Sequence, residues 1–207
     1  KQTVLIENKA GASGSIAAAQ VSKSPADGYT LMMLATPTML APHLYKKAGY
    51  DTVKDFTPVA TVYDLPIVVV VNPKLLPDVT DLKGLIANAK AQKTPLNYTS
   101  SGAGSFGHLS MELLKQMASF DMQHVPYKGG VPAITDTSSG QGPVMYADLE
   151  AALPHIQAGK LRAIAVGSPQ RVAMLPDVKT IAEQGIKGYE VNTWFGFVAP
   201  AGTPAEV

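Results

Sequence analysis

The chain has 207 residues, of which 46% are hydrophobic and 16% charged, and its formal net charge is +1. A balanced charge without a basic patch argues against nucleic acid binding through phosphate neutralisation. The absence of cysteine excludes disulfides, thiolate metal sites and cysteine nucleophiles, and no run is long and apolar enough to insert into a membrane.

Short β-prone runs and helical patterns alternate along the chain, which is typical of an α/β protein. The run 68–71 consists of four valines and is apolar on both faces, as expected for a central strand covered by helices. Strands are expected at 3–6, 30–34, 58–62, 67–71, 96–99, 122–125, 144–146, 161–166 and 193–198. Helices are expected at 15–22, 41–45, 82–92, 106–119, 130–138, 149–158 and 180–183.

A natural break near residues 96–101 predicts two lobes. Lobe I comprises 1–99 plus 193–207, because the strand at 193–198 is expected to return to it, and lobe II comprises 100–192. Two-lobed α/β proteins place a ligand between their lobes. The chain starts in a strand-like run and stops just after Pro204, where a helix would begin. We therefore expect it to be truncated at both ends.

The segment 98–109 (YTSSGAGSFGHL) predicts a strand, a Gly/Ser turn and a helix with Ser105 at its N-cap. Such a turn directs free backbone N–H groups and the positive end of a helix dipole at one point, which suits a carboxylate or phosphate. The expected ligand contacts in this turn are Ser101, Gly102, Ala103, Gly104 and Ser105.

Two other interpretations of this glycine loop remain open. It can be a plain glycine turn without a ligand. It also matches the dinucleotide fingerprint formally, with Gly102, Gly104 and Gly107 followed by Asp121. However, Asp121 precedes the next expected strand, whereas the fingerprint carboxylate ends one.

Further candidates follow other expected strands. The hydroxyls of Thr36 and Thr38 face a ligand or cap the next helix. Asp148, after the strand at 144–146, faces the ligand crevice or caps the helix at 149–158. The loop 127–129 adds amides and one cation, or is an ordinary turn; its residues are Tyr127, Lys128 and Gly129.

The histidines indicate neither a metal site nor catalysis. They fall in separate elements without metal-ligand spacing, and the sequence contains no GxSxG or SxxK motif. His108 can donate to a ligand, cap its helix or lie at the surface, and His124 is expected to be a core or partly buried strand residue. The other two histidines are His43 and His155. We expect no catalytic residue, no metal and no cofactor.

Several stretches of the sequence resemble Bug-type solute receptors, the extracytoplasmic binding components of tripartite tricarboxylate transporters. The resemblance spans the chain in order and is carried by IENKAGASG (6–14), ADGYTL (26–31), YTSSGAGS (98–105), VPYKG (125–129), ALPHIQAGKLRA (152–163) and WFGFVAPAGTP (194–204). It implies a two-lobed periplasmic binding protein-like (type II) fold, also called a Venus flytrap. It further implies a periplasmic protein that holds a small carboxylate through amides, hydroxyls and waters and passes it to membrane transporter subunits.

The sequence departs from the family pattern at its ends and near 137–143. The family's first strand and ligand loop would precede Lys1, and its C-terminal helices would follow Val207. Pro143 removes a ladder donor, so the strand after it is expected to start late or to lie at a sheet edge. Two alternative functions stay open: an α/β enzyme that binds a nucleotide or acyl group at the glycine loop, and a sensory module.

Overall fold

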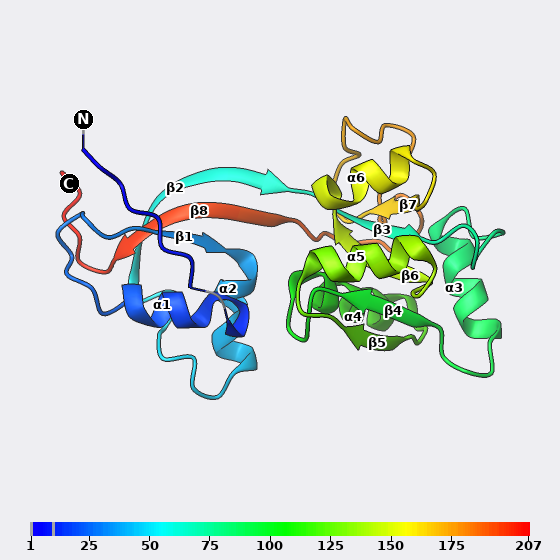
Figure 1. Ribbon diagram of the computed structural model, residues 1–207, viewed down its shortest axis with the longest axis horizontal. Coiled ribbons are helices and arrows are strands. Elements are labelled where there is room, and N and C mark those ends of the chain that lie inside the picture. The colour runs from blue at the N-terminus through cyan, green and yellow to red at the C-terminus, as the bar shows by residue number, and fades with distance from the viewer. Residues whose placement is uncertain (1, 10) are drawn as a thin grey trace. The chain divides into compact units, whose positions relative to one another are not determined.

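The computed structural model describes residues 2–9 and 11–207, and its chain divides into two compact units (Figure 1). The first unit comprises Lys1–Tyr63 and Trp194–Val207, and the second comprises Asp64–Thr193. Lys1 and Ala10, both expected in lobe I, lie outside the described residues.

The boundary between the compact units differs from the expected one near residue 99. Residues 64–99 belong to the second unit because their strands pair there. β3 (Ile67–Val71) lies between β6 (Val144–Asp148) and β7 (Arg162–Val166), and β4 (Asn97–Ser100) lies between β5 (Gln123–Pro126) and β6. Nothing in the local sequence at 67–71 specifies these partners, which come from far along the chain.

The second unit is built on a mixed five-stranded sheet with the order β5-β4-β6-β3-β7. β4 is parallel to β5 and to β6, whereas β3 is antiparallel to β6 and β7. β6 begins directly after Pro143, as expected, but it lies in the middle of the sheet, so the edge-strand alternative is wrong. The Pro143 carbonyl accepts a hydrogen bond of 2.9 Å from the Asn72 N–H.

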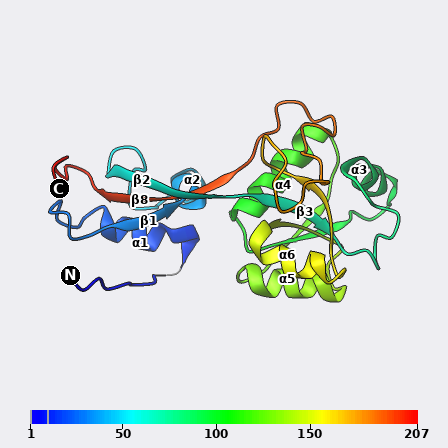
Figure 2. The ribbon, with the colours of Figure 1, turned by 90° about the horizontal axis from the view of Figure 1, so that it is seen from above.

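Helices cover both faces of this sheet (Figure 2). Ile67, Val69 and Val71 of β3 point into a core shared with α3 (Leu82–Ala91) and α4 (Phe106–Ala118). Val68 and Val70 point the other way, into a core shared with α5 (Gly130–Ser139) and α6 (Leu149–Gln157). All five β3 side chains are buried, so the valine run is a central strand, as its sequence predicts.

The first unit contains a three-stranded sheet in which β8 (Thr193–Pro200) lies between β1 (Met32–Ala35) and β2 (Phe56–Leu65). A short 3-10 turn, η1 (Ala12–Gly14), leads into α1 (Ser15–Val21), and α2 (Thr36–Leu44) follows β1. The small core gathers Ala18, Met32, Leu34, Phe56 and Val198 from these elements. The final strand therefore completes the sheet of the unit in which the chain began.

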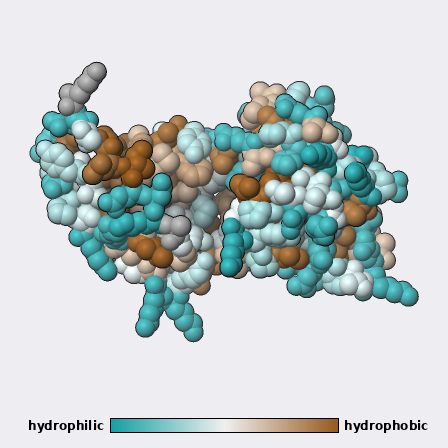
Figure 3. Space-filling view, in the orientation of Figure 1, coloured by the Kyte–Doolittle hydropathy of each residue, from teal (hydrophilic) through white to brown (hydrophobic). Residues whose placement is uncertain are grey.

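The expected strand at 3–6 is absent from the described residues. Val4, Leu5 and Ile6 are 82–85% exposed and form no secondary structure. A β-prone run becomes a strand only with a neighbour to pair with, and here this segment has none. Figure 3 shows apolar side chains gathered at the surface of the first unit.

Two expected helices also differ. α2 begins at Thr36 rather than residue 41, because Pro37 occupies its first turn, where a missing N–H costs nothing. Residues 180–183 form a turn instead of a helix. The Thr180 N–H donates to Glu183 Oε2 (2.7 Å) and the Glu183 N–H donates to Thr180 Oγ1 (3.0 Å), which is capping-box bonding around a turn that ends at Gly185.

Candidate functional site

Three loops of the second unit meet at one edge of its sheet. β5, β4 and β6 run parallel and are neighbours, so their carboxyl ends lie at the same edge. The loop 127–129 follows β5, the glycine loop 101–105 follows β4, and Asp148 ends β6. α5, α4 and α6 begin directly after them, which brings three helix N-termini to this edge. Open α/β sheets bind ligands at such an edge.

The glycine loop needs its glycines for conformation. Gly102 has a φ of 137° and Gly104 a φ of 75°, values that side chains with a Cβ rarely adopt. A turn closes between them where the Ser105 N–H donates to the Gly102 carbonyl (3.1 Å). Ser105 is the N-cap of α4, as predicted, because its Oγ accepts from the His108 N–H (3.3 Å).

Three of the loop amides that were expected to be free are engaged inside the protein, and the Ser105 N–H is one of them. The Gly102 N–H donates to Ser100 Oγ (3.1 Å), and the Gly104 N–H donates to Nδ1 of His108 (3.0 Å). Within the described part of the chain, the N–H groups of Phe106 and Gly107 have no hydrogen-bond partner. Among the described residues, the remaining donors are therefore the N–H groups of Ser101 and Ala103 in the loop and those of Phe106 and Gly107 in the first turn of α4, whereas the Ser105 hydroxyl donates to Ser100 Oγ (3.4 Å).

The loop 127–129 is joined to the glycine loop by backbone hydrogen bonds. The Tyr127 N–H donates to the Ser100 carbonyl (3.0 Å), and the Gly129 N–H donates to the Ser101 carbonyl (3.1 Å). Lys128 between them is exposed. These hydrogen bonds hold the two loops side by side, and Lys128 adds an exposed cation to them.

Asp148 occupies the N-cap position of α6 but its side chain caps nothing among the described residues. As a whole residue, Asp148 is exposed. The surrounding protein nevertheless desolvates it, and this burial, with the charge of Glu150 as a second cause, raises the pKa of Asp148. The capping alternative therefore lacks the hydrogen bond that would define it.

Thr36 and Thr38 belong to the first unit, and both hydroxyls contact backbone there. Thr36 Oγ1 accepts from the Trp194 N–H (3.2 Å). Thr38 is only 5% exposed and its Oγ1 donates to the Ser13 carbonyl (3.0 Å). Thr38 is thus a structural residue of its own unit, whereas Thr36 keeps a hydroxyl proton that this bond does not use.

A cluster behind the glycine loop was largely missed by sequence reasoning. His124 Nε2 lies 2.7 Å from Ser100 Oγ, and the His124 ring stacks on His108 with centroids 3.9 Å apart. Burial lowers the pKa of both imidazoles, that of His124 to about 4, with the charge of His108 as its second cause. Ser100 directly precedes the glycine loop, but nothing local marks His124 as its partner.

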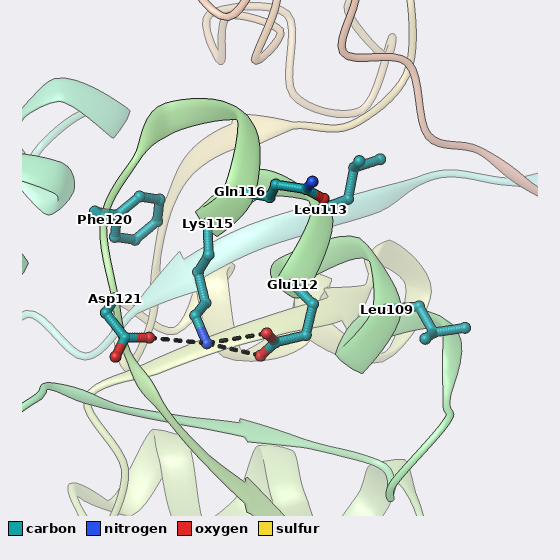
Figure 4. Close-up of a pocket in the computed structure, with 7 residues that line it drawn as sticks. All are labelled: Leu109, Glu112, Leu113, Lys115, Gln116, Phe120 and Asp121. Atoms are coloured by element: carbon teal, nitrogen blue, oxygen red, sulfur yellow. Dashed lines mark hydrogen bonds and ion pairs between the residues drawn. The ribbon is translucent and has the colours of Figure 1, made fainter. Parts of the chain in front are cut away.

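An ion-pair network on α4 supports this cluster (Figure 4). Lys115 Nζ contacts Glu112 (2.8 Å) and Asp121 (3.1 Å), and Glu112 accepts from the Tyr98 hydroxyl (2.6 Å). Burial acts to lower the pKa of Lys115, but the hydrogen bonds to Glu112 and Asp121 outweigh it and raise that pKa. The network lines an open pocket of about 540 Å³ on the C-terminal half of α4.

The same network argues against a dinucleotide at the glycine loop. Asp121, the carboxylate that the fingerprint would assign to a ribose, is paired with Lys115 and precedes β5 instead of ending it. Gly107 serves packing, because a Cβ there would lie 2.3 Å from the Tyr146 carbonyl oxygen.

Neither a metal-holding cluster nor a membrane-spanning helix occurs among the described residues. They contain no group of three or more histidines or carboxylates that could hold a metal ion. Among the same residues, no helix has the length and apolar character needed to cross a bilayer.

Comparison with known proteins gives consistent matches over the whole chain. The family model described as "Tripartite tricarboxylate transporter family receptor" matches residues 1–207. The protein BugT of Bordetella pertussis is 38% identical over 100% of this chain and 63% of its own length. A protein of Pseudomonas sp. strain P51 is 36% identical over 100% of this chain and 61% of its own length. The chain thus spans about three fifths of these curated relatives.

Solved structures of periplasmic and related proteins also match most of this chain. The chain is similar to Rpa4515 of R. palustris with adipate (TM-score 0.87, 40% identity, 98% of this chain and 67% of that one). It is similar to the periplasmic binding protein BugD (TM-score 0.85, 34% identity, 99% and 68%). It is also similar to MatC of Rhodopseudomonas palustris with bound malate (TM-score 0.81, 32% identity, 94% and 66%).

Proposed function

Because the chain belongs to the tripartite tricarboxylate transporter family of receptors, we propose that it is the solute-capturing part of such a receptor. It binds a small carboxylate in the periplasm and delivers it to the membrane subunits of a transporter. Two similar structures hold such acids, adipate and malate.

The observation that carries this proposal is the common edge where β5, β4 and β6 end. Four N–H groups without a partner among the described residues combine there with the positive end of the α4 dipole, those of Ser101, Ala103, Phe106 and Gly107. Most of the proposed donors are neutral and the one cation of these loops, Lys128, is exposed, which favours reversible binding of an anion. The proposed contacts within this unit are Ser101, Gly102, Ala103, Gly104, Ser105, Tyr127, Lys128, Gly129 and Asp148. Thr36 and Thr38, which belong to the first unit, stay separate predictions from the sequence.

We propose binding without turnover. The family model is described as that of a receptor, and a similar solved structure as that of a periplasmic binding protein. Glu112, His108 and His124 behind the glycine loop are engaged in hydrogen bonds and an ion pair. No observation favours the enzymatic or the sensory alternative.

Calorimetric titration tests the function. Adipate and malate are titrated into the chain beside ATP, NAD, acetyl-CoA and a diamine as other ligand classes. We expect saturable binding of at least one of the two acids and none of the nucleotides or the diamine. Binding at a hundredfold excess over Kd should stabilise the fold by about 2.7 kcal/mol in a parallel thermal melt. Binding of a nucleotide but of neither acid would contradict the proposal.

A further inference from the structure

Two stacked imidazoles lie directly behind the glycine loop. His108 comes from the first turn of α4 and His124 from β5, and their ring centroids are 3.9 Å apart at an interplanar angle of 18°. Tyr98 of β4 stacks on His124 at 5.0 Å and 26°. Three elements of the second unit thus meet in one aromatic column, which fixes both imidazole planes.

Each imidazole of this pair is bonded into the glycine loop. His108 Nδ1 accepts the Gly104 N–H at 3.0 Å. His124 Nε2 bonds Ser100 Oγ at 2.7 Å, and that oxygen accepts the Gly102 N–H at 3.1 Å. The pair therefore holds both positive-φ glycines of the loop, one directly and one through a hydroxyl.

The hydrogen bond from Gly104 specifies the proton position on His108. A nitrogen that accepts an N–H carries no proton, so neutral His108 has its proton on Nε2. The bond between His124 Nε2 and Ser100 Oγ can run in either direction, depending on the His124 tautomer. Ser100 Oγ also contacts the Gly102 carbonyl (3.1 Å) and accepts from the Ser105 hydroxyl (3.4 Å). His108 is therefore the imidazole whose unprotonated Nδ1 the loop requires.

The charged groups around the pair come from α4 and from the segment that follows it. Glu112 favours the protonated imidazoles, whereas Lys115 disfavours them. Asp121 pairs with Lys115, and the Tyr98 hydroxyl binds Glu112. Burial is the largest cause of the lowered pKa of both histidines, so the neutral form prevails at pH 7.

We propose that His108 and His124 are positioning residues for the anion site: as a neutral stacked pair they hold the glycine loop in the conformation that presents the first-turn donors of α4. Protonation of His108 at Nδ1 removes the acceptor of the Gly104 N–H and places two donors against each other. The loop then loosens, and carboxylate affinity falls at acid pH. The affinity part of this inference rests on the proposed function.

A ligand-free measurement tests the pair itself. In a ¹⁵N-labelled chain, the imidazole nitrogens and the Gly104 amide are followed by NMR from pH 8 to pH 4. We expect His108 Nδ1 to be unprotonated at pH 8, with a scalar coupling to the Gly104 nitrogen across the hydrogen bond. The coupling should disappear as His108 titrates. A protonated Nδ1 at pH 8, or a Gly104 signal indifferent to the titration, would overturn the proposal.

Two substitutions of His108 test its hydrogen-bond acceptor and its stacked ring separately. His108→Asn keeps an acceptor at the δ position that does not titrate, and His108→Phe keeps a stacking ring without an acceptor. We expect His108→Phe to weaken adipate or malate binding about tenfold, the effect of one lost hydrogen bond. We expect His108→Asn to retain binding and to show a smaller fall at acid pH than the parent, leaving only the part due to protonation of the acid itself.

The matched control is His43→Asn, which changes an exposed histidine of the first unit and should leave both affinity and its pH profile unchanged. Affinity that rises at acid pH, or a folded His108→Phe chain that binds like the parent, would overturn the inference. If neither acid binds even to the parent chain, the proposed function fails, and the ligand-free NMR titration still decides on the pair.

Discussion

Ionisation of the Asp148 carboxyl group is expected to lower the free energy of unfolding. It stands at the N-cap position of α6, where a carboxylate normally accepts a hydrogen bond, yet it accepts none from that helix. Burial first, and then the charge of Glu150, raise the pKa of Asp148 in the folded chain. The folded state therefore keeps this proton at pH values where the unfolded chain has lost it, and stability falls as the pH rises through that interval.

Asp148→Asn should remove this fall. We expect the variant to be more stable than the parent at pH 7, with a difference that vanishes below about pH 3, where both states are protonated. Urea unfolding at a series of pH values measures it. Glu150→Gln is the matched control and should act in the same direction but less, because burial is the larger cause. A destabilised Asp148→Asn chain at pH 7 would show that the carboxylate contributes to stability after all.

Local turn chemistry made part of the site predictable. Ser105 as N-cap and the loop glycines follow from a Gly/Ser turn between a strand and an amphipathic helix, and the structure has both. The partner of the Gly104 amide is His108, four residues further on, and sequence could have suggested it. His124 comes from another strand, and strand pairing is not encoded locally. The ligand contacts themselves stay a prediction.

α4 packs unusually closely on the sheet at its first turn. A Cβ at Gly107 would lie 2.3 Å from the Tyr146 carbonyl oxygen, which belongs to the backbone of β6 and cannot rotate away. At Gly130, in the first turn of α5, a Cβ would meet nothing within 4 Å. Two glycines at similar helix positions in the same unit thus have opposite surroundings.

Gly107→Ala should therefore destabilise the chain by about 1–3 kcal/mol, because α4 must shift away from β6. Gly130→Ala is the control, and we expect it to be neutral or to stabilise by up to about 1 kcal/mol through the unfolded state. Urea unfolding monitored by circular dichroism gives both values. Equal effects of the two substitutions would contradict the close packing of α4 on β6.

The elements of the second unit were largely predictable, because its helices have amphipathic patterns and clear stop signals. α3, α4, α5 and α6 each start at the expected residue. The first unit was harder. Pro37 obscures the start of α2, and the run at 3–6 has strand propensity but no neighbouring strand. The unit boundary depended on the partners of β3, which no local pattern reveals.

The sheet of the first unit leaves one apolar face uncovered. Met33 pairs with Phe197 across β1 and β8, and Tyr63 of β2 stacks on Phe195 at 4.8 Å. Met33, Val59, Tyr63 and Phe197 are 37–56% exposed. β2 is an edge strand, and residues 58–63 carry no charge. Uncharged edge strands with apolar faces pair readily with other chains.

We therefore expect the 207-residue chain to self-associate as its concentration rises. Val59→Lys, which places a charge on the edge strand, should reduce this association. Val53→Lys is the matched control, because Val53 is 84% exposed in the same unit but lies outside the sheet. Light scattering across a concentration series measures the mass. A parent chain that stays monomeric, or an equal effect of the two lysine substitutions on association, would contradict self-association through this face.

The strand order of the first unit also sets a sequence of events during folding. β1 and β2 do not pair with each other but flank β8, which is made last among the described strands. The five strands of the second unit are all complete by residue 166, before β8 begins. During synthesis the second unit can complete its sheet before β8, the partner of β1 and β2, has been made. Contacts between such distant parts of a chain form slowly, so we expect the sheet of the first unit to close after that of the second.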